Sequence, residues 1–268
     1  MDRSAIEWTD STWNPVTGCT KVSPGCAYCY AEAITLRFRR GGPFLPGLST
    51  IRLHPDRLAI PEKWRAPRRV FVNSMSDLFH EDVPLEFIQR VFKVMERASR
   101  HTFQILTKRE VRLHSLAPKL HWPSNVWMGV SVENQFWAEK RIPYLLQVPS
   151  RVRFLSVEPL LKPVDLRPYL GGLQWVIVGG ESGPRARPIH ADWIRRIRDD
   201  CRESNVPFFF KQWGGRTSKA GGRLLDGRVY DDMPSTPEII NRAPAVNASK
   251  ANSGSLTETR RPVTSVGI

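Results

Sequence analysis

Arg-Val-Phe-Val-Asn-Ser-Met-Ser-Asp, at residues 69–77, is an apolar run that ends in a cluster of polar side chains. Its first part is rich in β-branched and aromatic residues without strict alternation, as in a strand buried on both faces of a parallel sheet. Similar runs recur at residues 102–106, 126–130, 152–156, 175–178 and 207–210. A weaker run lies earlier in the chain, at residues 13–17. This repetition predicts a fold built on parallel strands.

Helical patterns lie between most of these runs. Apolar residues recur on one helical face after Pro84 and again from about Ala191, where the periodicity makes Cys201 a core residue. A third pattern covers residues 134–147, although Pro143 should break or kink that helix. Strands that alternate with helices predict an α/β fold with right-handed crossovers, and six or seven strands would make a partial or nearly closed α/β barrel.

The composition fits one large domain followed by a tail. The chain has 268 residues, 41% of them hydrophobic, and residues 1–234 are expected to form the barrel domain. Residues 223–230 predict a small hairpin with Asp226-Gly227 at its turn, and the polar stretch 235–268 predicts a disordered tail. No run has the roughly 18 apolar residues of a membrane span, and the first residues are polar, so we expect a cytoplasmic monomer without membrane contact.

Polar groups follow each predicted strand. In a parallel barrel these ends share one face, which is where such folds place their active sites. Loops are polar in any case, which accounts for about half of these positions. The remainder suggests a ligand site, in which carboxylates bind ribose hydroxyls or an amino group and paired glycines allow close backbone approach. The residues concerned are Ser74, Ser76, Asp77, Ser131, Glu133, Glu158, Gly179, Gly180 and Glu181.

Three cysteines, Cys19, Cys26 and Cys29, lie close together near the start of the chain. A structural zinc site usually takes four ligands, and no second Cys-x-x-Cys occurs, so zinc would need His54, His80 or a water. A four-iron cluster held by three cysteines instead leaves one iron free for an external chelator. That arrangement is the hallmark of radical enzymes that use S-adenosylmethionine.

The chain is strongly basic. The last 34 residues hold four basic and two acidic residues, so +12 of the formal net charge of +14 lies in residues 1–234. Such a charge favours a nucleic acid or a nucleotide as partner over a merely solvated surface. The basic clusters lie at residues 37–40, at 63–65 with 68–69, at 108–109 and at 195–198. The candidate substrate contacts near the predicted site are Lys108, Arg109, Arg185, Arg187 and Lys211.

Taken together, these motifs resemble a known family. The Cys-x6-Cys-x2-Cys spacing with Tyr28 before the third cysteine is similar to the radical S-adenosylmethionine signature, which usually has three residues between the first two cysteines. With residues 70–80, 156–160, 179–183 and 209–214, it resembles the phage and bacterial three-Cys-motif family named after phage gene products thirty-seven and sixty-eight. The resemblance covers residues 4–234, and the role of that family is largely unassigned.

The resemblance implies a partial, TIM-like (β/α)6-type barrel with the cluster in the loop after the first strand. Cys19, Cys26 and Cys29 would hold a [4Fe-4S] cluster, with S-adenosylmethionine on the fourth iron. An external electron donor would drive reductive cleavage to a 5′-deoxyadenosyl radical. Ser74, Ser76 and Asp77 would meet the methionine amino group. Ser131 and Glu133 would meet the ribose or the carboxylate. The pair Gly179-Gly180 and Glu181 would serve the adenosine or the substrate.

Three functions remain open on the sequence. The favoured one is a radical S-adenosylmethionine enzyme that modifies or repairs nucleic acid or a nucleotide. The alternative is a zinc-stabilised, non-catalytic nucleic-acid-binding protein. The third is a phage interaction protein whose cysteines are vestigial. They differ in what the cysteines bind: iron with S-adenosylmethionine, zinc with a fourth ligand, or no metal.

Overall fold

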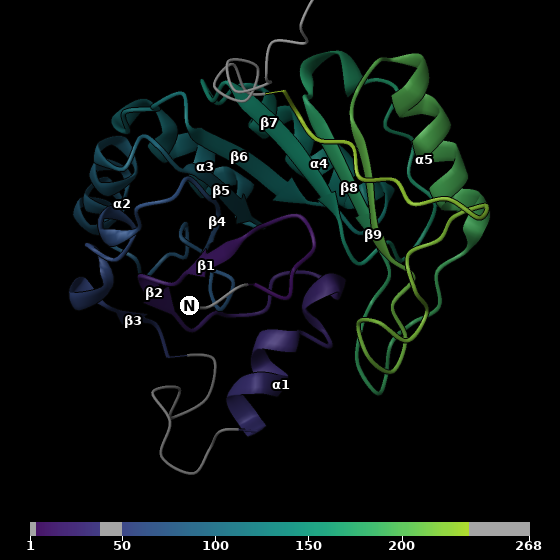
Figure 1. Cartoon of the computed structure of the whole chain (residues 1–268), viewed down its shortest axis with the longest axis horizontal. Coiled ribbons are helices and arrows are strands. Elements are labelled where there is room, and N and C mark those ends of the chain that lie inside the picture. Colours follow the sequence, from purple (N-terminus) through teal and green to yellow (C-terminus); the bar gives the residue numbers. More distant parts are fainter. Residues whose placement is uncertain (1–3, 38–49, 236–268) are drawn as a thin grey trace, which may run out of the picture. The chain divides into compact units, whose positions relative to one another are not determined.

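Seven parallel strands form one sheet in the computed structural model, which describes residues 4–37 and 50–235 (Figure 1). The sheet curls into a half-barrel with an edge strand on either side. In spatial order the strands are β1 (Ser11–Trp13), β4 (Arg69–Val72), β5 (Thr102–Thr107), β6 (Val126–Ser131), β7 (Val152–Val157), β8 (Trp175–Gly179) and β9 (Phe208–Gln212). The predicted α/β half-barrel is confirmed.

Helices fill most of the crossovers between these strands. In chain order they are α2 (Leu85–Arg97), α3 (Glu110–Leu116), α4 (Gln135–Leu146) and α5 (Ala191–Glu203). Only the short helix η5 (Leu170–Gly172) lies between β7 and β8. Helices α2 to α5 cover the outer face of the sheet (Figure 1), where apolar side chains of strands and helices form the larger core.

The inner face of the sheet carries a second, largely aromatic core. The ring of Trp175 lies at its centre, with ring centroids 5.6 Å from Phe154, 5.9 Å from Trp127 and 6.2 Å from Trp8. Because successive side chains of a strand alternate between the two faces, the apolar runs fill both cores at once. This inner core forms a floor below the carboxyl ends of the strands.

The expected strand at residues 13–17 is wrong as a single element. It is divided into β1 and β2 (Val16–Thr17), and β2 pairs with β3 (Arg52–Leu53) in a separate two-stranded sheet. The reason lies at Pro15, which has no N–H with which to continue the parallel ladder. Helix α1 (Tyr30–Arg37) and the short helices complete the described elements: η1 (Pro24–Cys26), η2 (Pro55–Arg57), η3 (Pro61–Lys63) and η4 (Ala117–Lys119).

Pro143 does not end its helix. Helix α4 begins after Asn134, whose side chain accepts from the backbone N–H of Trp137 at 3.2 Å, and it continues to Leu146. Pro143 lies on the exposed face, where water can satisfy the carbonyl group that lost its helical donor.

The chain after β9 makes the predicted turn but hardly a hairpin. Asp226 and Gly227 both have positive φ, 52° and 74°, as in the tight turns that join two antiparallel strands. Leu225 and Arg228 exchange backbone hydrogen bonds of 2.9 and 3.1 Å as an isolated bridge, and no named strand flanks the turn.

Some expectations lie outside the described residues. They are the tail from residue 236 onward and most of the basic cluster at 37–40. The chain divides into two units after Pro234, and only the first is described here. No helix in the described ranges is long and apolar enough to cross a membrane.

Candidate functional site

The three clustered cysteines lie on residues 19–29, the cysteine segment, which connects β2 to α1. Cys26 ends η1, and Cys29 directly precedes α1. All three thiols are free and partly exposed. Within residues 4–37 and 50–235, no three His, Cys, Asp or Glu side chains are grouped so that they could hold a metal ion.

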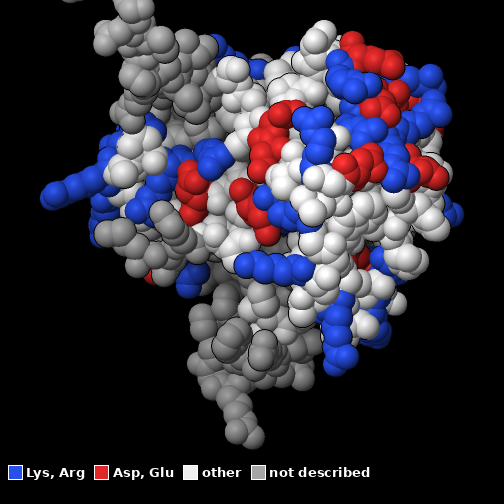
Figure 2. All heavy atoms as spheres, turned by 45° about the vertical axis from the view of Figure 1, so that its right-hand side comes forward, with Lys and Arg blue, Asp and Glu red and all other residues white. Residues whose placement is uncertain are grey.

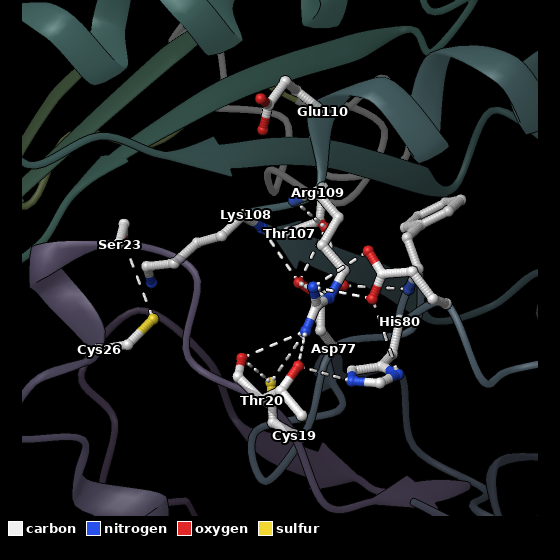
Figure 3. Close-up of polar contacts among 12 residues, drawn as sticks. Cys19, Thr20, Ser23, Cys26, Asp77, His80, Thr107, Lys108, Arg109 and Glu110 are labelled. Carbon is white, nitrogen blue, oxygen red and sulfur yellow. Dashed lines mark hydrogen bonds and ion pairs between the residues drawn. The ribbon is translucent and has the colours of Figure 1, made fainter. Parts of the chain in front are cut away.

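The first contact of the cysteine segment with the sheet is made by Arg109, which follows β5 (Figure 3). Its guanidinium donates to the carbonyl and the hydroxyl of Thr20 at 3.2 and 2.9 Å and lies 3.9 Å from the sulfur of Cys19. It also makes ion pairs with Asp77 at 3.8 Å and with Glu81 at 2.9 Å. Arg109 is buried, and these contacts hold the cysteine segment, while its expected role as a substrate contact stays a prediction.

Asp77 supports this contact from the end of β4. Its carboxylate accepts from the hydroxyl of Thr107 at 2.7 Å and from the backbone N–H groups of Phe79 and Lys108 at 3.0 Å each. Buried carboxylates are stable when their oxygens are satisfied in this way. Asp77 therefore joins β4 to β5 below the cysteine segment.

The second contact is made by Glu133, which follows β6. It accepts from the hydroxyl of Ser23 at 2.5 Å, and a Cβ atom placed on Gly25 would lie only 2.6 Å from Cγ of Glu133. On its other side Glu133 forms a 2.9 Å ion pair with Arg141 of α4, and both side chains have 0% exposure. Arg141 also donates to the backbone carbonyl of Ser131 at 2.7 Å.

The third contact is made by Glu181 and Arg187, which follow β8. Arg187 donates to the two carboxylate oxygens of Glu181 at 2.8 and 2.5 Å and to the backbone carbonyl of Pro24 at 2.9 Å. The hydrogen bonds with Glu181 raise the pKa of Arg187 above its usual value. The guanidinium groups of Arg187 and Arg185 lie 5.1 and 4.8 Å from the ring centroid of Tyr28.

Ser74 and Ser76, which follow β4, point back to the first strands. The Ser74 hydroxyl donates to the side-chain oxygen of Asn14 at 3.2 Å, and the Ser76 hydroxyl donates to the carbonyl of Val16 at 2.8 Å. The hydroxyl of Tyr30 donates to the carbonyl of Ser74. These serines join the end of β4 to Asn14 and β2, just before the cysteine segment.

The inner face of the half-barrel carries polar side chains at its carboxyl edge. Ser131 and Ser156 are register partners on β6 and β7, and the hydroxyl of Ser131 is buried without a hydrogen-bond partner. Glu158 makes a 2.7 Å ion pair with Lys211 of β9. A buried hydroxyl without a partner is unusual in a native protein and calls for an explanation, such as an ordered water or a bound ligand.

Like Arg185, Lys108 forms no ion pair among the described residues, whereas Arg109, Arg187 and Lys211 do. It follows β5, and its side chain extends toward Ser23 and Cys26 (Figure 3). Lys108 and Arg109 thus place two positive charges beside the cysteines, on neighbouring residues of one strand end.

The thiols suit an iron-sulfur cluster chemically. Three free thiols on one segment can supply three thiolates, and the charges of Lys108 and Arg109 would offset their negative charge. Burial, followed by the nearby charge of Asp77, raises the pKa of the Cys19 thiol to about 12, although Arg109 opposes the shift. Cys19 is therefore neutral without metal, and a bound metal would displace its proton.

The fourth cysteine is a core residue, as predicted. Cys201 on α5 has 0% exposure and packs in the larger core. Burial raises the pKa of its thiol to about 12, so it stays protonated. It is a natural control position for the three partly exposed cysteines.

Gly180 allows close approach of two backbone segments. A Cβ atom at this position would overlap the backbone carbonyl of Trp213 and come within 3.1 Å of Ile189. We expect Gly180→Ala to lower the free energy of unfolding by about 3 kcal/mol because backbone must move to make room. The matched control Gly171→Ala, in η5, meets no atom within 4 Å and should change stability by less than about 1 kcal/mol. Urea unfolding measures both variants, and equal stabilities would contradict the close approach.

Sequence reasoning found the carboxylates but missed their partners. Thr20, Ser23 and Arg141 complete the contacts, and only the first two carried a signal, as polar residues inside the cysteine motif. Arg141 gave none, because it lies in a helix with charged neighbours. The candidate zinc ligands His54 and His80 each contact a threonine hydroxyl at 2.9 Å through Nε2.

One protein family matches most of the chain. Its model, described as "Protein of unknown function (DUF5131)", matches residues 3–234. The description names neither a phage gene product nor a cysteine motif, so the resemblance to the phage three-Cys-motif family stays a prediction. No curated protein matches the sequence at a significant level.

Solved structures of spore photoproduct lyase are similar in chain trace. A cysteine-to-serine mutant is 13% identical with a TM-score of 0.49, and the match covers 78% of each chain. A complex with dinucleoside spore photoproduct is 16% identical with a TM-score of 0.44, covering 71% of this chain and 60% of that one. A double mutant with bound AdoMet and dinucleoside spore photoproduct is 13% identical with a TM-score of 0.45, covering 73% and 62%.

Proposed function

Because this chain belongs to the DUF5131 family, whose description assigns no function, we propose one from its own residues. We propose a radical S-adenosylmethionine enzyme that carries a [4Fe-4S] cluster on Cys19, Cys26 and Cys29 and acts on a nucleic acid or a nucleotide. The basic charge of residues 1–234 supports that class of substrate.

The observation that carries the proposal is the docking of the cysteine segment onto the carboxyl ends of parallel strands. Three separate strand ends hold it, through Arg109, Glu133 and Arg187. Active sites of parallel α/β barrels lie at this edge of the sheet. A merely structural zinc loop has no need to be held over that edge, whereas a reactive centre must face the substrate.

When bound, the cluster would pass one electron from an external donor to S-adenosylmethionine and so supply a 5′-deoxyadenosyl radical that abstracts hydrogen from the substrate. The chain supplies binding, orientation and exclusion of water. The inner aromatic core around Trp175 closes the half-barrel below the site, so water is excluded from that side. Lys108 and Arg109 place positive charge beside the thiolates.

The groups that remain to bind S-adenosylmethionine lie on the inner face. We assign the unpartnered hydroxyl of Ser131 to the ribose or the carboxylate of S-adenosylmethionine. Glu158 and Lys211 are placed to meet the amino acid part or the adenosine, with Gly179 packed against Glu158. The side chains of Asp77, Glu133 and Glu181 are occupied in holding the cysteine segment, so they orient the site.

Ser131→Ala should weaken binding of S-adenosylmethionine by about 3- to 10-fold, because one hydrogen bond to the ligand is lost. Its thermal stability should stay near that of the wild type, since the hydroxyl has no partner in the protein to lose. The control Ser115→Ala removes an exposed hydroxyl of α3 and should not change the affinity. Isothermal titration on reconstituted protein measures both, and equal affinities would remove Ser131 from the site.

The proposed reaction is tested by reductive cleavage of S-adenosylmethionine. Protein reconstituted without oxygen is incubated with S-adenosylmethionine and dithionite, and 5′-deoxyadenosine and methionine are quantified by chromatography. The expected result is 5′-deoxyadenosine formation that requires both reductant and protein. A fully loaded cluster that produces none would contradict the proposed function.

A further inference from the structure

A groove runs along the free edge of β1, and the functional site does not use it. One wall consists of Thr12, Trp13 and Asn14, and the other of the segment 57–68 that leads into β4. Its volume of about 820 Å³ is that of a ligand-sized cleft. Asn14 lines the groove and also accepts from Ser74, so one end of the groove adjoins the strand ends at the cysteine segment.

The lining of the groove is positively charged without any acidic side chain. It contains four cations, which are Arg57, Lys63, Arg65 and Arg68. Among residues 4–37 and 50–235 none of the four forms an ion pair. The nearest acids are used outside the groove, since Glu62 pairs with Arg97 at 2.7 Å and Asp10 with Arg69 at 2.8 Å.

The rest of the charged surface is organised differently. On the face shown in Figure 2, over the side of the molecule with α5, Lys and Arg side chains lie beside Asp and Glu. There Arg195 and Arg198 both pair with Asp226, at 2.7 and 2.6 Å. Paired charges of this kind attract little from solution, whereas unpaired cations in a concave site attract anions strongly.

The backbone of the charged wall and the side chain of Arg68 are held in place before any ligand binds. The guanidinium of Arg68 donates to the Ser11 hydroxyl at 2.9 Å and lies 5.0 Å from the ring centroid of Trp64. The indole of Trp13 donates to the carbonyl of Arg57 at 2.9 Å, and Arg100 donates to the carbonyl of Trp64 at 2.8 Å. A preorganised site loses less entropy when it binds.

We propose that this groove binds the phosphodiester backbone of a single-stranded nucleic acid. Four cations in one groove, without ion-pair partners among the described residues, supply the positive charge that a phosphate backbone requires, and the same lining holds the apolar side chains of Ile60 and Trp64, which bases would contact. This inference deepens the proposed function. It rests on that function only where it takes the bound nucleic acid to be the substrate of the enzyme. Binding itself requires no iron, so the two claims can fail separately.

The test is the double variant Lys63→Gln with Arg65→Gln, because both residues are exposed and neither makes a side-chain hydrogen bond in the described structure. Fluorescence anisotropy with single-stranded DNA and RNA of about 12 nucleotides measures the affinity at several salt concentrations. The variant should bind about 10- to 30-fold more weakly at 0.1 M salt, with a salt slope lower by about 1.4. The control Arg90→Gln with Lys93→Gln loses the same charge from exposed positions of α2 and should bind within about twofold of the wild type.

Three results would overturn this inference. One is equal affinity of the groove variant and the control for the single strand. That result would show that the groove does not bind nucleic acid, without bearing on the proposed enzyme activity. Another is tighter binding of a duplex of the same sequence than of the single strand. The third is displacement of the oligonucleotide by poly-glutamate at equal charge concentration, since an acidic peptide would then fit equally well. The iron-free Cys26→Ala protein should bind like the wild type.

Discussion

Cys26→Ala protein is expected to emerge from anaerobic reconstitution without a stable cluster, whereas wild-type protein should hold about four irons per chain. Removing one of three thiolates leaves two on a partly exposed segment, too few to keep the cluster. Formation of 5′-deoxyadenosine should fall below detection in the same preparation. Iron analysis and absorption spectroscopy make the measurement.

Cys201→Ala is the matched control for this experiment. It removes a thiol as well, but from the buried face of α5, and should keep the full iron content. A modest loss of stability, about 1 kcal/mol, is expected from the small cavity. Equal iron in the Cys26→Ala and wild-type proteins would show that Cys26 is no ligand.

Glu133→Ala should be the most destabilising single change among the carboxylates of the site. It leaves Arg141 charged at 0% exposure without its 2.9 Å partner, and breaking a buried pair in this way costs about 3–5 kcal/mol. Glu110, 3.4 Å from the guanidinium, compensates in part, which places the expected loss near the lower end. The variant also loses the contact of Ser23 and should retain less iron.

Urea unfolding of the metal-free protein isolates the stability effect from metal binding. Glu139→Ala is the control, because this exposed glutamate of α4 only accepts from Gln135 at 3.0 Å and should change stability by less than about 0.5 kcal/mol. Similar free energies of unfolding for the two variants would contradict the importance assigned to the buried pair.

The strands of the sheet could be predicted because each is buried on both faces. Phe71 points to the inner core while Val70 and Val72 point to the outer one, so the run carries no polar position. The interruption after Trp13 is local as well, since it follows from the missing N–H of Pro15. Residues near one another in sequence decide both outcomes.

The organisation of the site could be predicted only in part. The cysteines and the carboxylates after the strands were visible, but their pairing depends on contacts between distant residues, such as Ser23 with Glu133 or Pro24 with Arg187. A glutamate that binds a ligand and one that holds a loop look the same in a sequence. The hydroxyl of Ser131 can be told apart from the other serine hydroxyls only in the folded protein, where it has no hydrogen-bond partner among the described residues.

The charged groove, too, could be predicted from the sequence only in part. Residues 63–65 and Arg68 can be recognised in the sequence as a basic cluster. Whether their charge is free to attract an anion depends on which cations the neighbouring acidic residues pair with. Glu62 precedes Lys63 and Arg69 follows Arg68, and only the fold shows that both are paired away from the groove.

The central claim is that the cysteine segment carries an iron-sulfur cluster. The most direct measurement is the iron, sulfide and zinc content of wild-type protein purified without oxygen, with absorption spectra before and after dithionite. About four irons and four sulfides per chain, with bleaching on reduction, is the predicted result. Stoichiometric zinc without iron, persisting after anaerobic reconstitution, would contradict the claim and favour a zinc-stabilised binding protein.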